Sequence, residues 1–127
     1  NLQQDYQATV KRFFALQFMG VKSDPKAVRQ LRNDIMSKPA TMQALTGGLA
    51  ILNTADFSQQ VIEQPKLWIL GRLDKLIPAS LADALEPNES QQVDVMRKAA
   101  HVPFVTHPDD FLALVMPFIK QVQHEQA

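Results

Sequence analysis

The chain has 127 residues, a formal net charge of zero, and 46% hydrophobic against 20% charged residues. This composition suits one globular domain, is too apolar for a disordered chain, and carries no basic excess that would indicate a nucleic-acid binder. The absence of cysteine excludes disulfides, thiolate metal sites and a cysteine nucleophile. No apolar run approaches the ~18 residues of a membrane span, and no signal segment opens the chain, so we expect a cytoplasmic protein.

The first forty residues predict two helices. Positions from Tyr6 to Gln17 share one face at i, i+4, i+7 and i+11, which is the spacing of an amphipathic helix. A second helix is expected from Pro25, because proline is tolerated in the first turn and Ser23 or Asp24 can cap the helix.

A third helix is expected from about Thr41 to Leu52. Gly47 and Gly48 lie in its middle, and each costs about 1 kcal/mol relative to alanine. The pair therefore predicts either a break in the helix or the close approach of another backbone.

Two strands are expected after these helices. Residues 67–70 form a short apolar run ended by Gly71, typical of a strand buried on both faces, and residues 92–96 alternate as a second strand. A helix is predicted between them over 78–85, a loop over 101–107, and a last helix from Pro108. Strands joined by a helical crossover are parallel, so this sheet would have open edges that another polypeptide, a second copy or a missing N-terminal part must cover.

Charge is unevenly spread along the chain. Residues 1–40 carry a balance of +4 and the remainder carries −4. Such asymmetry is typical of a molecule with one end that meets an acidic partner, although a pair of solvated helices explains it equally well.

Asp74 and His101 form the strongest candidate site. Each follows one of the two expected strands, and the carboxyl ends of parallel strands are where open sheets place their sites. An aspartate that orients a histidine is two thirds of a nucleophile triad; the alternative is a turn-capping aspartate beside an ordinary loop histidine. None of the five serines has the flanking glycines of G-x-S-x-G, so the chain has no recognisable nucleophile.

The surroundings of both residues resemble the α/β-hydrolases. Leu67-Trp68-Ile69-Leu70-Gly71-Arg72-Leu73-Asp74 is similar to the strand and loop that bear the catalytic acid in that family. Ala99-Ala100-His101-Val102-Pro103-Phe104, ahead of His107-Pro108, is similar to its catalytic histidine loop. The family order is serine, acid, histidine, and the last two stand here in that order.

The N-terminal helices narrow this resemblance to the carboxylesterases of biotin biosynthesis, which hydrolyse the methyl ester of pimeloyl-acyl-carrier protein. The similar segments run from Thr9 to Gln17 and from Gly47 to Leu52. The resemblance implies that Asp74 is the triad acid and His101 the general base, with no metal or organic cofactor. It further implies that an acyl channel is lined by Phe13, Phe14, Ala15, Leu16, Gln17 and His101, and that Arg12 and Arg29 contact an acidic acyl-carrier protein.

We therefore expect an α/β chain that corresponds to the C-terminal part of an α/β-hydrolase. Residues 1–55 would form a helical cap and residues 56–127 two strand-helix units of the parallel core. The intact enzyme would be a serine carboxylesterase, and this chain would be inactive without the N-terminal half that supplies the serine. The alternatives are a hydrolase of another small ester or lactone, and a non-catalytic helical module that binds an acidic protein. We expect no nucleic-acid or membrane partner, and the open sheet edges would allow self-association.

Overall fold

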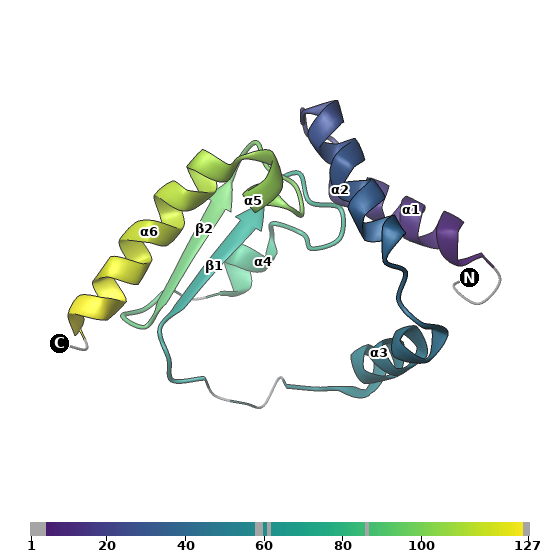
Figure 1. Ribbon diagram of the computed structural model, residues 1–127. Helices are drawn as coiled ribbons and strands as arrows, with labels where there is room; N and C mark the ends of the chain where they lie inside the picture. Colours follow the sequence, from purple (N-terminus) through teal and green to yellow (C-terminus); the bar gives the residue numbers. More distant parts are fainter. Residues whose placement is uncertain (1–4, 58–59, 61, 86, 126–127) are drawn as a thin grey trace.

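The computed structural model describes residues 5–57, 60, 62–85 and 87–125. The first four residues of the predicted cap segment 1–55, and five residues of the predicted core segment 56–127 besides position 86, lie outside the described part. Three helices come first in the chain, and a two-stranded sheet with further helices follows (Figure 1). This arrangement confirms the predicted α/β class. The elements are α1 (Tyr6–Gln17), α2 (Pro25–Ser37), α3 (Met42–Thr54), β1 (Lys66–Gly71), α4 (Leu81–Ala84), β2 (Gln91–Met96), α5 (Pro103–Thr106) and α6 (Pro108–Glu125).

Helices α1 and α2 form a helical hairpin. The N-terminus of each helix is capped by an aspartate side chain. The Asp5 carboxylate accepts a hydrogen bond from the Ala8 N–H at 2.9 Å, and Asp24 accepts one from the Lys26 N–H at 2.9 Å. Between the helices, Gly20 adopts a φ of +83°, a conformation that side chains with a Cβ rarely adopt. The predicted start of α2 is thereby confirmed, with Asp24 as its cap.

Helix α3 runs unbroken through Gly47 and Gly48, so the expected break is wrong. The expected close approach is also wrong within the described chain, because a Cβ built on either glycine meets no atom within 4 Å. The Thr41 hydroxyl caps the helix by accepting from the Ala44 N–H at 3.2 Å. A capped helix of 13 residues tolerates the glycine cost, and its side chains are exposed except for half-buried Leu45.

Strands β1 and β2 pair in parallel, as predicted, with Leu67 opposite Gln92 and Gly71 opposite Met96. Side chains alternate between the two faces of this sheet. Helix α6 packs on the face that carries Gln92, whose side-chain amide donates to Gln121 of α6 at 2.9 Å. Helix α4 packs against β2.

Two local predictions differ from the structure. The helix expected over 78–85 is reduced to α4, because Pro78–Ser80 forms a turn in which the Leu81 N–H donates to the Pro78 carbonyl at 3.0 Å. The loop expected over 101–107 contains the single turn of α5. A helix of four residues has no periodic pattern that sequence reasoning could detect.

The core is small in the part of the chain that the structure describes. Only Leu70 and Gly71 of β1 are buried, and Trp68 is 38% exposed, so the expected burial of this strand on both faces is not reached here. Parallel strands are normally covered on both faces, so β1 keeps an uncovered apolar surface. The buried hydrophobic residues are Phe14, Leu70, Met96, Ala99, Ala100 and Val102.

Candidate active site

The candidate site lies where the two strands end. Two backbone hydrogen bonds hold the loop after β1: the Arg72 N–H donates to the carbonyl of Met96 at the end of β2 at 3.0 Å, and the Leu73 N–H donates to the Ala99 carbonyl in the following loop at 2.9 Å. These bonds extend the parallel pairing beyond the sheet. They bring Asp74 and His101 to the same edge of the sheet.

Gly71 allows the second loop to pass directly over the end of β1. A Cβ built on Gly71 would collide with the Ala100 carbonyl oxygen and would lie 2.8 Å from the Ala99 carbonyl oxygen. Because these atoms belong to backbone, no side-chain rotation could relieve the clash. The sequence predicts Gly71 only as the end of a strand, since no local pattern indicates which distant segment crosses a glycine.

The structure joins Asp74 and His101 directly. Asp74 Oδ2 lies 2.9 Å from His101 Nδ1, which is a hydrogen-bond distance, and the two side chains are 6% and 32% exposed respectively. The other carboxylate oxygen, Oδ1, accepts from the Leu76 N–H at 2.7 Å and the Ile77 N–H at 3.0 Å. An ionised carboxylate can use both oxygens in this way, so Asp74 is fixed by its own loop and also orients His101.

The pKa of Asp74 is lowered from the usual value of an aspartate. Burial alone would raise this pKa, but the hydrogen bonds from the Ile77 N–H, from His101 and from the Leu76 N–H outweigh it, with a further contribution from the charge of His101. Asp74 is therefore ionised at neutral pH. An ionised partner at Nδ1 leaves Nε2 as the ring nitrogen available for proton transfer.

An apolar hollow of about 490 Å³ lies beside His101. The described residues that line it include no serine, threonine or cysteine, so His101 faces a space without a nucleophile. They are Leu67, Ile69, His101, Pro103, Phe104, Phe111, Val115, Phe118 and Ile119.

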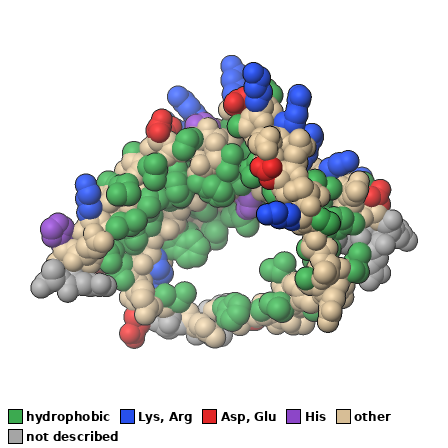
Figure 2. Space-filling view, viewed as in Figure 1, with side chains coloured by type: hydrophobic (Ala, Val, Ile, Leu, Met, Phe, Trp, Pro, Cys, Tyr) green, Lys and Arg blue, Asp and Glu red, His purple; other side chains and the backbone are tan. Residues whose placement is uncertain are grey.

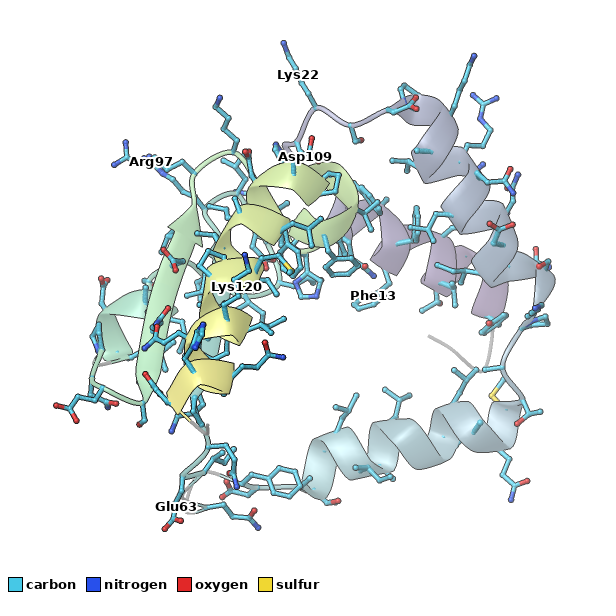
Figure 3. The ribbon with its side chains drawn as sticks, turned by 60° about the vertical axis from the view of Figure 1, so that its left-hand side comes forward. Phe13, Lys22, Glu63, Arg97, Asp109 and Lys120 are labelled. Carbon is cyan, nitrogen blue, oxygen red and sulfur yellow. The ribbon has the colours of Figure 1, made fainter. Side chains whose placement is uncertain are left out.

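The expected acyl-channel residues occupy the second half of α1. Phe13 is 53% exposed and projects toward the sheet and α6, whereas Phe14 is buried and packs on Phe18 with ring centroids 4.9 Å apart (Figure 3). Ala15 is exposed, and Leu16 and Gln17 are half-buried. In this structure, therefore, Phe14 packs within the helical region, and Phe13 is the more exposed of the two rings.

Arg12 and Arg29 are exposed on α1 and α2, far along the chain from the acid–histidine pair. Figure 2 shows Lys and Arg side chains gathered over this helical hairpin, and hydrophobic side chains around the opening between the hairpin, the sheet and α3. The basic N-terminal segment found in the sequence is therefore also a basic surface.

Within the described residues, no three His, Cys, Asp or Glu side chains are grouped closely enough to hold a metal ion. None of the helices in this part of the chain has the length and apolarity needed to cross a membrane.

An aspartate with a largely covered side chain, bonded to a histidine at the ends of two parallel strands, has the geometry of the acid–base part of a nucleophilic hydrolase site. Comparison with known proteins agrees with this class. No family model matches the chain. It is, however, homologous over almost its whole length to curated pimeloyl-[acyl-carrier protein] methyl ester esterases, which confirms the resemblance found in the sequence.

The match to the esterase of Serratia marcescens is 43% identical over 121 residues, covering 91% of this chain and 47% of the relative. The Yersinia pseudotuberculosis serotype O:1b protein is 40% identical over 126 residues, covering 94% of this chain and 48% of the relative. The Photorhabdus laumondii protein is 39% identical over 121 residues, covering 92% of this chain and 46% of the relative. The chain thus spans about half the length of the curated relatives it matches.

Proposed function

We propose that this chain provides the acid, the base and the cap of a serine carboxylesterase that hydrolyses the methyl ester of pimeloyl-acyl-carrier protein. The observation that carries the proposal is the hydrogen bond between Asp74 and His101, formed at the ends of two parallel strands. The homology to pimeloyl-[acyl-carrier protein] methyl ester esterases supports the choice of substrate.

The proposed mechanism assigns one proton path to His101. Nε2 takes the proton of a serine hydroxyl, supplied by the half of the relatives that this chain does not match, as the serine oxygen attacks the ester carbonyl. The same nitrogen then donates that proton to the oxygen of the departing methanol. In the second half of the cycle, Nε2 takes a proton from the water molecule that attacks the acyl-enzyme and returns it to the serine oxygen. Asp74 stabilises the imidazolium formed in each half of the cycle, which requires the ionised carboxylate that its lowered pKa maintains.

The helical segment 1–55 would bind the substrate, and the segment 56–127 would carry the acid and the base. We propose that Phe13 to Gln17 line the acyl chain's path, with Phe13 as the exposed aromatic contact. Arg12 and Arg29 are proposed to contact the acidic carrier protein, because exposed basic surfaces attract an acidic partner and raise the association rate.

The experiment joins this sequence behind the unmatched half of the Serratia marcescens relative, so that one chain has the relatives' full length. We expect hydrolysis of pimeloyl-acyl-carrier-protein methyl ester, and a loss of at least about 10³-fold in kcat with His101→Ala, as for loss of a general base. His124→Ala, at an exposed position near the end of α6, is the matched control and should leave kcat unchanged. Retention of full activity by the His101 variant would refute the proposal.

A further inference from the structure

The backbone of Val102, the residue that follows His101, is held by the turn of α5. The Val102 carbonyl accepts hydrogen bonds from the N–H groups of Val105 at 3.0 Å and Thr106 at 3.1 Å. It also accepts one from the Thr106 hydroxyl at 3.2 Å, so a side chain closes the same turn. Because Val102 follows His101 directly, the groups that fix this carbonyl also fix the backbone from which the imidazole extends.

The Thr106 hydroxyl is in turn held by the imidazole of His107. His107 Nδ1 lies 2.9 Å from Thr106 Oγ1. A hydroxyl has one hydrogen to donate and lone pairs with which to accept. A hydroxyl that donated to Nδ1 would leave its oxygen 3.2 Å from the Val102 carbonyl oxygen with no hydrogen between them. His107 therefore donates from Nδ1 to Thr106, and Thr106 donates to Val102; we call these two consecutive hydrogen bonds the Thr106 bridge.

His107 is held where α5 ends and α6 begins. Its N–H donates to the Pro103 carbonyl at 2.8 Å, and its carbonyl accepts from the Phe111 N–H at 2.9 Å. The rings of Phe104 and Phe111 pack edge to face with centroids 6.0 Å apart, which joins α5 to α6 a second time. Helix α6 is the longest helix in the described part of the chain. The Thr106 bridge thus connects the loop that carries His101 to a long helix.

We propose that Thr106 and His107 are positioning residues for His101. The site requires His101 Nδ1 to stay bonded to Asp74 while Nε2 transfers protons, and an error of about 1 Å in such a geometry can cost about 100-fold in rate. Asp74 orients the ring, and the Thr106 bridge holds the backbone that carries it. Neither Thr106 nor His107 lines the hollow beside His101, so both act through the backbone. The effect on catalysis rests on the proposed function, whereas the bridge itself does not.

The first test observes the histidine rings of the 127-residue chain by NMR. We expect neutral His107 to carry its proton on Nδ1. The Nδ1 proton of His101 should exchange with water at least ~10-fold faster in Thr106→Val than in the wild type. Thr106→Ser retains the hydroxyl and should restore the exchange rate to within about twofold. A neutral His107 protonated on Nε2, or an unchanged exchange rate in Thr106→Val, would overturn the inference.

Thr54 provides the matched control. Its hydroxyl makes the same kind of bond, to the Ala50 carbonyl four residues earlier at 2.9 Å, near the end of α3. Helix α3 stands apart from the sheet (Figure 1). Thr54→Val should therefore leave the His101 exchange rate and kcat within about twofold of the wild type.

The second test measures kcat and KM in the single joined chain. Thr106→Val and His107→Leu should each lower kcat about 10-fold and change KM less than about twofold, because a misplaced base affects the transition state more than substrate binding. The side-chain amide of His107→Asn can donate where Nδ1 does, and should restore kcat to within about threefold. Failure of both the serine and the asparagine variants to restore kcat would assign Thr106 and His107 a purely structural role and overturn the inference.

The two tests separate this inference from the proposed function. If the joined chain has no esterase activity but the His101 exchange rate follows the Thr106 hydroxyl, the bridge holds His101 as inferred and the proposed function fails. If His101→Ala inactivates the joined chain while Thr106→Val and His107→Leu keep full kcat, the proposed function stands and this inference fails.

Discussion

The sheet region from β1 to α6 and the helical region from α1 to α3 differ in how their important residues are held. In the sheet region, Asp74 is fixed by hydrogen bonds to its own loop and to His101, and Gly71 lets the histidine loop cross the strand. In the helical region, Phe13, Arg12 and Arg29 are exposed, and α3 stands apart from the sheet (Figure 1). The acid–base geometry is thus a local property of the sheet, whereas the helical region presents surfaces whose contribution depends on a partner.

The largest expected effect concerns Asp74 in the sheet region, whose carboxylate is held by three hydrogen bonds. Asp74→Asn in the joined full-length chain should lower kcat about 10⁴-fold, because an amide favours the wrong histidine tautomer and does not stabilise the imidazolium. Ester hydrolysis at neutral pH measures this effect. A loss of less than about tenfold would mean that the pair is structural.

The same carboxylate should make the stability of the protein depend on pH. Because the folded-state pKa of Asp74 lies below its ordinary value of 3.8, ionised Asp74 stabilises the fold above that value. This contribution is lost as the pH falls through the lowered folded-state pKa. Urea unfolding at pH 7 and at pH 3 should therefore show a smaller difference for Asp74→Asn than for the wild type.

A pair of identical substitutions compares the two regions directly. Gly71→Ala should lower kcat about 100-fold, because the added Cβ displaces the Ala99–Ala100 backbone that positions His101. Gly48→Ala in α3 should instead stabilise the protein by about 0.5–1 kcal/mol, since no atom lies within 4 Å of the new methyl group. Urea unfolding and kcat are measured for both variants. Destabilisation by Gly48→Ala would show that another backbone packs on α3 in the joined chain.

A smaller effect is expected from the basic surface of the helical hairpin. Replacing Arg12 and Arg29 with Glu should lower kcat/KM for the carrier-linked ester about tenfold at low salt, relative to the free methyl ester. The difference should shrink at high salt, where surface charges are screened. Lys120→Glu on α6 makes the same kind of charge change away from the hairpin, and serves as the control. An equal loss with Lys120→Glu would show that the overall net charge, and not a defined docking surface, causes the effect.

The smallest effect is expected on α3. Leu52 is 80% exposed, so Leu52→Ser should change the free energy of unfolding by less than about 0.5 kcal/mol in this chain. Urea unfolding of the 127-residue chain and of the joined chain should be compared. A loss above 1.5 kcal/mol in the joined chain alone would show that the additional half covers this helix.

The structure shows which features were readable from the residues and which were not. The start of α2 followed from capping chemistry, which lies within a few residues. The parallel pairing followed from the helical crossover expected between the two strands. The hydrogen bond between Asp74 and His101 followed from placing both residues after neighbouring strands.

Other features depend on contacts between distant segments, or on signals too short to read. The requirement for glycine at position 71 arises from the crossing of Ala99 and Ala100, which no local pattern encodes. The turn of α5 is shorter than one helical repeat. The different exposure of Phe13 and Phe14 depends on where α1 meets its neighbours, which the helical spacing alone does not show.

The two hydrogen bonds from the Leu76 and Ile77 N–H groups to Asp74 have a consequence for how the site is assembled. The carboxylate is oriented by a loop closed over three residues, so it can reach its final direction as soon as that turn forms, on the submicrosecond scale of short-loop closure. His101 arrives only when β2 has paired with β1, which brings together residues 27 positions apart. We therefore expect the carboxylate to be oriented before His101 reaches it during folding, and the hydrogen bond between them to form when β2 pairs with β1.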